Sequence, residues 1–209
     1  MEVAVLNIQG KETGRKITLD ASVFEIEPNE HAIYLEVKQY LAGQRQGTHK
    51  AKERNEIAGS TRKIKKQKGT GTARAGSIKS PTIKGGGRVF GPRPRSYDIK
   101  LNKSVKRLAK RSIFSQKAKE NQIKVLEDFN FETPKTKDFT QILVALGFEN
   151  KKTLFVLAES NKNVYLSARN LPKTKVVTVS ELNSFDLANA SEIVLIEGSV
   201  AKIQENLTK

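Results

Sequence analysis

Lysine and arginine side chains crowd the stretch between residues 43 and 95 of this 209-residue chain. The stretch holds fifteen basic residues against two acidic ones, Glu53 and Glu56, and so carries +13 of the chain's net charge of +16. Ammonium and guanidinium groups at this density can neutralise phosphates and release their counterions, which is the chemistry of polyanion binding. The candidates for phosphate contact are Arg45, Lys50, Lys52, Arg54, Arg62, Lys63, Lys65, Lys66, Lys68, Arg74, Lys79, Lys84, Arg88, Arg93 and Arg95.

Glycines and small hydroxyl residues lie between these cations. Ten of the fourteen glycines fall in the same stretch, and glycine lets a backbone approach a sugar–phosphate chain closely or adopt positive φ. Serine and threonine add neutral donors to phosphate and 2′-hydroxyl groups. Phe90 is the only aromatic residue here, so a base-stacking platform is not expected. The composition favours recognition of the shape and backbone of a folded RNA.

The basic stretch lacks the apolar period of a helix or a strand. A segment of this kind buries too little apolar surface to offset the entropy of ordering itself. We therefore expect it to be disordered alone and to take its shape from a polyanion. A flexible solubilising tail is the alternative, but tails usually lie at a terminus, whereas this segment is inserted within the chain.

The rest of the chain is expected to form one globular α/β domain from residues 1–42 and 96–209, interrupted by an extended basic loop over residues 43–95. Strand and helix patterns alternate from residue 123 onward, which predicts a mainly parallel sheet with helices on both faces. Gly10 and Gly14 are assigned to a hairpin turn. The expected strands are 3–8, 15–19, 123–126, 153–158, 176–179 and 193–196, and the expected helices are 30–43, 103–121, 137–146, 163–171, 185–188 and 200–207.

Two of these helices carry further predictions. The helix over residues 30–43, capped by Asn29, should be largely buried, whereas the helix after its cap Asn102 should have two faces. The apolar stripe of this second helix, residues 103–121, would be Val105, Leu108, Ala109 and Ser112. Its opposite, phosphate-facing side would be Lys103, Lys106, Arg107, Lys110 and Lys117. Thr136 is the expected cap of the next helix.

Residues suited to catalysis are scarce. The chain has no cysteine and two histidines, His31 and His49, of which the first is assigned a structural role and the second contact with RNA or solvent. No phosphate-loop motif, carboxylate pair or metal-ligand cluster is present, so we expect no enzyme activity, no metal and no cofactor. A cofactor-dependent RNA-modifying enzyme is the main rival, with Gly198 as its only glycine after a strand end. A regulator of a structured messenger RNA is a weaker rival.

The chain's compartment and assembly follow from similar exclusions. A pI near 10 points to nucleic acid or an anionic membrane surface. There is no apolar run of the ~18 residues needed to span a bilayer, and the first residues read as a strand rather than a signal peptide. We expect a cytoplasmic location and no homo-oligomer.

The order of the residues in the basic stretch is more specific than its composition. Its motifs are GQRQGT at 43–48, QKGTGTARAGSIKSP at 67–81 and GGGRVFGPRPR at 85–95, followed by KLNK at 100–103, KRLA at 106–109 and SARNLP at 167–172. Together they resemble the bacterial large-subunit ribosomal protein L4 (universal L4) family over essentially the whole chain. This resemblance implies a structural constituent of the large ribosomal subunit that binds 23S rRNA and supports assembly.

The resemblance also implies particular neighbours. In that family the loop penetrates the rRNA, and its tip helps form the constriction of the nascent-peptide exit tunnel beside ribosomal protein L22. The implied partners are therefore 23S rRNA, other large-subunit proteins including L22, and the nascent peptide. By position the tip covers residues 62–72, with tunnel-lining residues Ile64, Lys65, Lys66, Gln67, Lys68, Gly69 and Thr70. The chain departs from the family by having Ile64-Lys65-Lys66 where Pro-Trp-Arg is common, and Thr72 where arginine is common.

Overall fold

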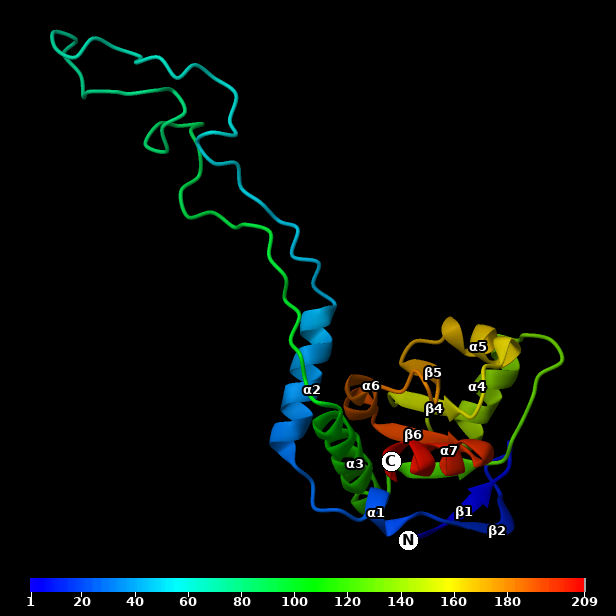
Figure 1. Cartoon of the computed structure of the whole chain (residues 1–209). Coiled ribbons are helices and arrows are strands. Elements are labelled where there is room, and N and C mark those ends of the chain that lie inside the picture. Colours follow the sequence, from blue (N-terminus) through cyan, green and yellow to red (C-terminus); the bar gives the residue numbers. More distant parts are fainter. Residues whose placement is uncertain (209) are drawn as a thin grey trace. The chain divides into compact units, whose positions relative to one another are not determined.

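The computed structural model describes residues 1–208 and divides the chain into two compact units. The folded unit combines residues 1–41 with the chain from Lys100 onward, and the loop unit spans Ala42–Ile99. All the strands described belong to the folded unit, in which they form one sheet (Figure 1). The loop unit has no helix or strand beyond the last turn of a helix that ends at Gly43.

The sheet of the folded unit is mainly parallel. Its strands are β1 (Glu2–Leu6), β2 (Glu12–Thr18), β3 (Ile123–Leu126), β4 (Thr153–Leu157), β5 (Thr174–Thr178) and β6 (Glu192–Ile196). They lie in the order β2-β1-β3-β6-β4-β5, and only the β1–β2 pair is antiparallel. The expected hairpin is present, because the chain turns at Gly10, whose φ is 77°. The α/β prediction is confirmed.

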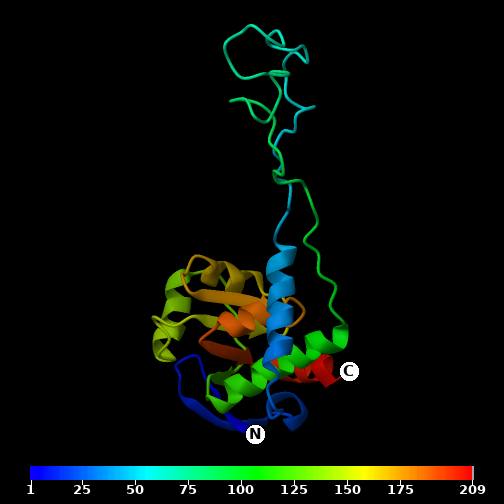
Figure 2. The same ribbon diagram turned by 90° about the vertical axis from the view of Figure 1, so that its left-hand side faces the viewer.

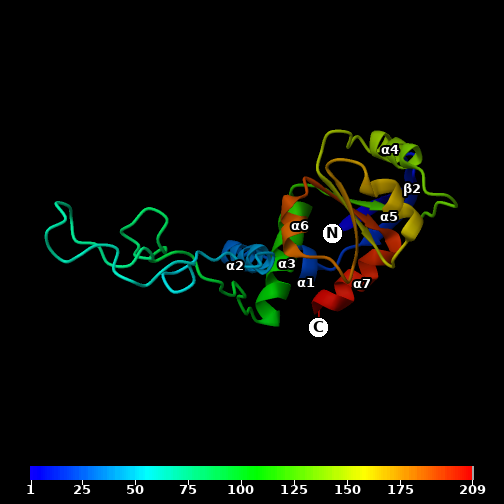
Figure 3. The ribbon, with the colours of Figure 1, turned by 90° about the horizontal axis from the view of Figure 1, so that it is seen from above.

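Helices cover both faces of this sheet. They are α1 (Ala21–Phe24), α2 (Glu30–Gly43), α3 (Lys103–Lys119), α4 (Thr136–Ala145), α5 (Lys162–Arg169), α6 (Ser184–Asn189) and α7 (Glu197–Thr208). One apolar cluster joins the sheet to α1, α3, α6 and α7, and the other joins it to α4 and α5. The two layers can be followed in Figure 3.

Strand β4 shows why the sheet needs both layers. All five of its residues are buried, since Leu154 and Val156 belong to the first cluster while Phe155 and Leu157 belong to the second. A strand whose alternate side chains are all apolar is stable only when both faces of its sheet are covered. The continuous apolar run of this strand predicted its burial on both faces, and this prediction is confirmed.

The prediction that α2 is largely buried is wrong. Only Ala32 and Glu36 are buried, while Tyr34 and Leu41 are 56% and 44% exposed. Figures 1 and 3 show α2 beside α3, on the side of α3 that faces away from the sheet. One side of the helix makes its contacts, such as the Tyr40 ring stacked 5.2 Å from that of Phe185. Tyr34 and Leu41 remain exposed because only one side of the helix packs against the rest of the folded unit.

The apolar stripe predicted for α3 is displaced toward the end of the helix. Ala109 is fully buried, but Leu108 is 37% exposed and Val105 only half-buried. The buried residues are Ala109, Ser112, Ile113, Phe114, Ser115 and Ala118. The first turn of α3 therefore lies outside the core, because the helix packs on the sheet mainly through its second half.

Buried serines of α3 hold the chain that leads into α2. The Ser115 hydroxyl accepts a hydrogen bond from the Ile26 amide at 3.1 Å, and the Ser112 hydroxyl accepts one from the Asn29 amide at 3.0 Å. Asn29 then caps α2 as expected, its side chain accepting from the Ala32 amide at 3.0 Å. These bonds satisfy backbone groups at a point where the chain is in neither helix nor strand.

The other predicted caps are only partly right. Asn102 occupies the cap position of α3, but its side chain makes no capping hydrogen bond. Thr136 is the first residue of α4 rather than its cap, a position that Lys135 occupies. The Lys135 amide donates a hydrogen bond to the Ser167 hydroxyl of α5 at 3.0 Å. This tertiary contact holds the residue that precedes α4, and it does not cap the amides of the first helical turn.

Candidate nucleic-acid interface

The two legs of the loop unit are joined by backbone hydrogen bonds although neither leg is a strand. Within this unit the legs run side by side in Figures 1 and 2. The cross-leg bonds run from Arg95 N to Gly47 O (3.1 Å), Ala51 N to Pro92 O (3.1 Å), Arg88 N to Lys52 O (2.9 Å) and Ile64 N to Gly76 O (3.0 Å). They give the loop unit a definite path without a hydrophobic core.

Some of the glycines are required where the chain of the loop unit crosses itself. A Cβ on Gly87 would lie 2.4 Å from the Arg54 nitrogen, and one on Gly86 would lie 1.8 Å from the Ser80 oxygen. Both distances are too short for a side chain. We predicted glycines for approach to an external backbone, whereas these two permit approach of the loop to itself. Gly69 and Gly71 have positive φ and open space around them.

Ser77 is a buried polar centre of the loop unit that the sequence analysis missed. Its side chain donates to the Ser60 carbonyl at 2.9 Å and accepts from the Lys79 amide at 3.1 Å. Ser77 and Gly87 are the only residues of this unit that are buried. A serine among lysines and glycines gives no sequence signal for burial.

The cations of the loop unit point into solvent. Of the fifteen candidates for phosphate contact, all are exposed except Lys79, which is half-buried. Two are engaged by the acidic residues of the stretch: the Arg93 guanidinium donates to Glu53 at 2.7 Å, and Lys50 pairs with Glu56. The pKa of Glu56 is lowered, first by its hydrogen bond from Lys50. Most of the positive charge therefore remains available to a polyanion.

The tip of the loop unit holds the seven residues predicted to line the tunnel. All seven, Ile64 to Thr70, are exposed. The Lys65 ammonium donates to the Thr72 hydroxyl at 2.7 Å, and Lys63 bonds to Gln67. Lys66 and Lys68 make no hydrogen bond or ion pair with residues 1–208. The tip thus presents two free ammonium groups.

Tyr97 is a second feature that the sequence analysis missed. The Arg45 guanidinium lies 3.7 Å from the centre of its ring, and that of Arg95 lies 4.7 Å from it. Hydrogen bonding from Arg95 lowers the pKa of Tyr97, with a smaller contribution from the charge of Arg45. Cation–π contacts of this kind restrict the two arginines at the base of the loop.

The cations on the basic side of α3 differ in how exposed they are. Lys103 is exposed, whereas Lys106, Arg107 and Lys110 line a hollow of about 270 Å³ beside Leu182. The Lys110 ammonium donates to the Leu182 carbonyl at 2.8 Å. Burial lowers the pKa of Lys110, and the charge of Glu36 opposes that shift. The role of Lys110 in phosphate contact stays a prediction, but its ammonium already has a protein acceptor.

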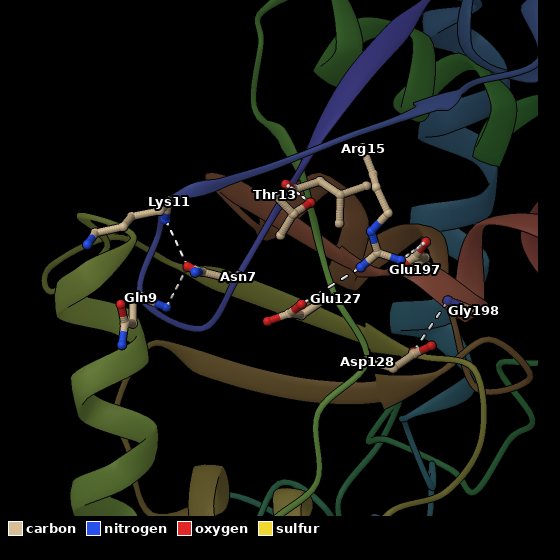
Figure 4. A network of polar contacts seen from close by, with 10 residues as sticks. Asn7, Gln9, Lys11, Thr13, Arg15, Glu127, Asp128, Glu197 and Gly198 are labelled. Carbon is tan, nitrogen blue, oxygen red and sulfur yellow. Dashed lines mark hydrogen bonds and ion pairs between the residues drawn. The ribbon is translucent and has the colours of Figure 1, made fainter.

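The edge of the sheet required by the rival cofactor-binding hypothesis is occupied by protein groups (Figure 4). Arg15 bridges Glu197 at 3.1 Å and Glu127 at 3.8 Å. The Gly198 amide donates to Asp128 at 3.4 Å, close to the start of α7. Carboxylates lie where the phosphate of a cofactor would have to bind, so this edge is unsuited to a nucleotide.

Residues 1–208 offer neither a metal site nor a membrane-spanning helix. This part of the chain holds no group of three or more His, Asp or Glu side chains placed to bind a metal ion. Its helices are all too short or too polar to span a membrane. His31 is exposed, with its ring stacked 6.3 Å from that of Tyr34, and His49 is also exposed. The loop unit is therefore the strongest candidate interface.

Comparison with known proteins assigns the chain to a family. A model described as the ribosomal protein L4/L1 family matches residues 17–206. The chain is 70% identical over 209 residues to a protein of Flavobacterium psychrophilum and 69% identical over 209 residues to one of Flavobacterium johnsoniae, covering 100% of both chains in each case. It is 60% identical over 204 residues to a protein of Cytophaga hutchinsonii, covering 98% of each. All three relatives are named large ribosomal subunit protein uL4.

The matches define a class of ribosomal proteins that are not enzymes. The chain belongs to the ribosomal protein L4/L1 family, because the family model covers most of its length. This membership confirms the resemblance drawn from the loop motifs and the prediction that the chain is not an enzyme.

Proposed function

We propose that this chain is a structural protein of the large ribosomal subunit in the bacterial cytoplasm, and that its loop unit binds 23S rRNA. The observation that carries the proposal is the exposure of a segment with +13 net charge that has almost no buried residues of its own. Such a segment gains little from its own contacts and much from neutralised phosphates. The relatives from the two Flavobacterium species are named as proteins of the large ribosomal subunit.

The folded unit would anchor the protein on the particle. Lys103, Lys106 and Arg107 at the start of α3 are the cations best placed for this, since they lie on the half of the helix that leaves the core. They can meet phosphates with little rearrangement of the folded unit. The loop unit would then fold with rRNA during assembly and offset phosphate repulsion around it.

The tip would line the nascent-peptide exit tunnel near ribosomal protein L22. Residues 64–70 are all exposed and include the free ammonium groups of Lys66 and Lys68. Ile64 is 47% exposed and would add an apolar surface at the position where the family commonly has proline. The nascent peptide would pass close to a tip that carries flexible lysine side chains and no aromatic ring.

A salt titration tests the electrostatic part of this function. Lys68→Ala should weaken binding to transcribed 23S rRNA and lower the slope of log K against log[salt] by roughly 0.7–0.9, because one fewer phosphate is neutralised. Lys137→Ala, which removes an exposed lysine from α4, is the matched control and should leave the slope unchanged. Filter binding from low to moderate salt measures both. An affinity of the wild-type chain that did not depend on salt would contradict the proposed function.

A further inference from the structure

Phe90 is the most conspicuous side chain of the loop unit that the charge argument leaves unexplained. It is the only aromatic residue between positions 43 and 95, and it is 103% exposed. Its φ is 53°, in the left-handed region that residues with a Cβ seldom adopt. A large apolar ring is thus held fully in solvent by an unfavourable backbone conformation. Strain and exposure at one residue point to a ligand.

The backbone on both sides of Phe90 is fixed to the opposite leg. On one side the Arg88 amide donates to the Lys52 carbonyl at 2.9 Å, and on the other the Pro92 carbonyl accepts from the Ala51 amide at 3.1 Å. Between them, a Cβ on Gly91 would lie 2.7 Å from the Ala51 Cβ, so residue 91 must stay close to that leg. Residues 89–91 therefore form an outward bulge between two anchored points. Phe90 occupies its apex.

The surroundings of Phe90 are cationic. Lys52, Arg54 and Arg88 are exposed on the paired legs beside the bulge. Val89, the next residue, is 50% exposed. An apolar ring among free cations suits a ligand with a flat apolar face and anionic substituents, and a nucleotide has both. A hydrophobic pocket of a partner protein would have to accept the ring together with these three charges.

We propose that Phe90 stacks on one unpaired base of the bound RNA. This inference rests on the proposed function and adds to it a single base contact within an interface otherwise made to phosphates and sugars. One aromatic residue cannot form a platform for successive bases. It can insert at one splayed base, which fixes the position of the leg along the RNA.

Affinity measurements separate stacking from charge. With the full-length chain and transcribed 23S rRNA of Flavobacterium johnsoniae, Phe90→Ala should weaken binding roughly tenfold or more, as loss of one stacked base does. The salt slope should not change, because no charge is removed. Phe90→Tyr should restore most of the affinity, whereas Phe90→Leu, which is apolar but has no ring, should not. Equal affinity of the alanine variant and the wild type, or full rescue by leucine, would overturn the stacking proposal.

Fluorescence gives an independent readout. The chain contains no tryptophan, so Phe90→Trp introduces a single reporter at the bulge. Stacking on a base should quench its emission when the transcript is added. Tyr165→Trp, a half-exposed position in α5 of the folded unit, is the control and should respond far less. An unquenched tryptophan at position 90 in a variant that still binds RNA would show that this residue does not stack on a base and would overturn the proposal. Failure of the wild-type chain to bind the transcript would instead overturn the proposed function.

Discussion

At the residue scale, the folded unit contains a buried carboxyl group that the charge pattern did not predict. Glu36 of α2 is 7% exposed and accepts a hydrogen bond from the Ser184 hydroxyl of α6. Burial raises the pKa of Glu36, while the Ser184 hydrogen bond and the charges of Lys110 and Lys106 act in the opposite direction. Burial also lowers the pKa of Lys110. Burial thus disfavours the charged form of each group, while the opposite charge of the other group favours it.

The raised pKa of Glu36 predicts a pH-dependent stability. Since the pKa is higher in the folded state than the ordinary 4.5, the folded chain binds more protons than the unfolded chain in the window that begins near 4.5 and ends at the folded pKa. The free energy of unfolding therefore falls as pH rises through that window. Glu36→Gln removes this titration, so its stability should decline less than that of the wild type between about pH 4.5 and neutrality.

Urea unfolding followed by circular dichroism at stepped pH measures this difference. Glu30→Gln is the matched control, because Glu30 lies exposed in the first turn of the same helix, and it should retain the wild-type pH dependence. Indistinguishable pH profiles for Glu36→Gln and the wild type would show that the titration of Glu36 does not contribute.

Residue identity predicted charge but not burial. The cations of the basic stretch could be found from the sequence because almost all of them remain exposed. Lys110 was assigned with them, although its ammonium bonds to Leu182, a residue far along the chain. Ser77 and Tyr97 were missed for the same reason. Each has a partner far along the chain, Ser60 for Ser77 and Arg45 for Tyr97, which no local pattern reveals.

At the element scale, the strands and helices of the folded unit followed closely from periodicity. The continuous apolar run of β4 predicted a strand buried on both faces, and all five of its residues are buried. The buried extent of α2 and the stripe of α3 were predicted wrongly, because the apolar face of a helix does not show how far the helix extends beyond its sheet. The four-residue helix α1 was missed altogether, being too short to show a period.

The crossing of the loop legs at Gly87 yields a prediction at the same scale. Gly87→Ala places a Cβ 2.4 Å from backbone of the other leg, so the legs must separate there and the cations they carry must move apart. Affinity for transcribed 23S rRNA should fall by about tenfold or more, since the RNA-bound loop can no longer bring its legs together at this point without strain. Filter binding at constant salt measures the change.

Gly76→Ala is the matched control for that substitution. Gly76 lies in the same loop, has no positive φ, and has open space where a Cβ would be added. Its affinity should stay within about twofold of the wild type, because an alanine that meets nothing leaves the path of the legs unchanged. Equal losses of affinity in both variants would show that the close approach of the legs at Gly87 is not required for RNA binding.

At the scale of the whole molecule, charge and burial are divided between the two units. The folded unit has two apolar clusters and an ordinary core, whereas the loop unit buries only Ser77 and Gly87. A unit with so little burial has cross-leg hydrogen bonds as its main internal support, and each such exposed bond contributes little net free energy. We therefore expect the folded unit to be stable by itself and the loop unit to become ordered when it binds RNA.

Hydrogen exchange of the loop unit is the most direct test of this account. Mass spectrometry would follow peptides from residues 43–95 in the free chain and in purified large subunits, with peptides from β4 and β6 as an internal reference. The account predicts fast exchange of the loop in the free chain, strong protection in the subunit, and protection of the reference strands in both. Strong protection of residues 43–95 in the free chain, or fast exchange within the subunit, would contradict the claim that the loop is ordered by ribosomal RNA.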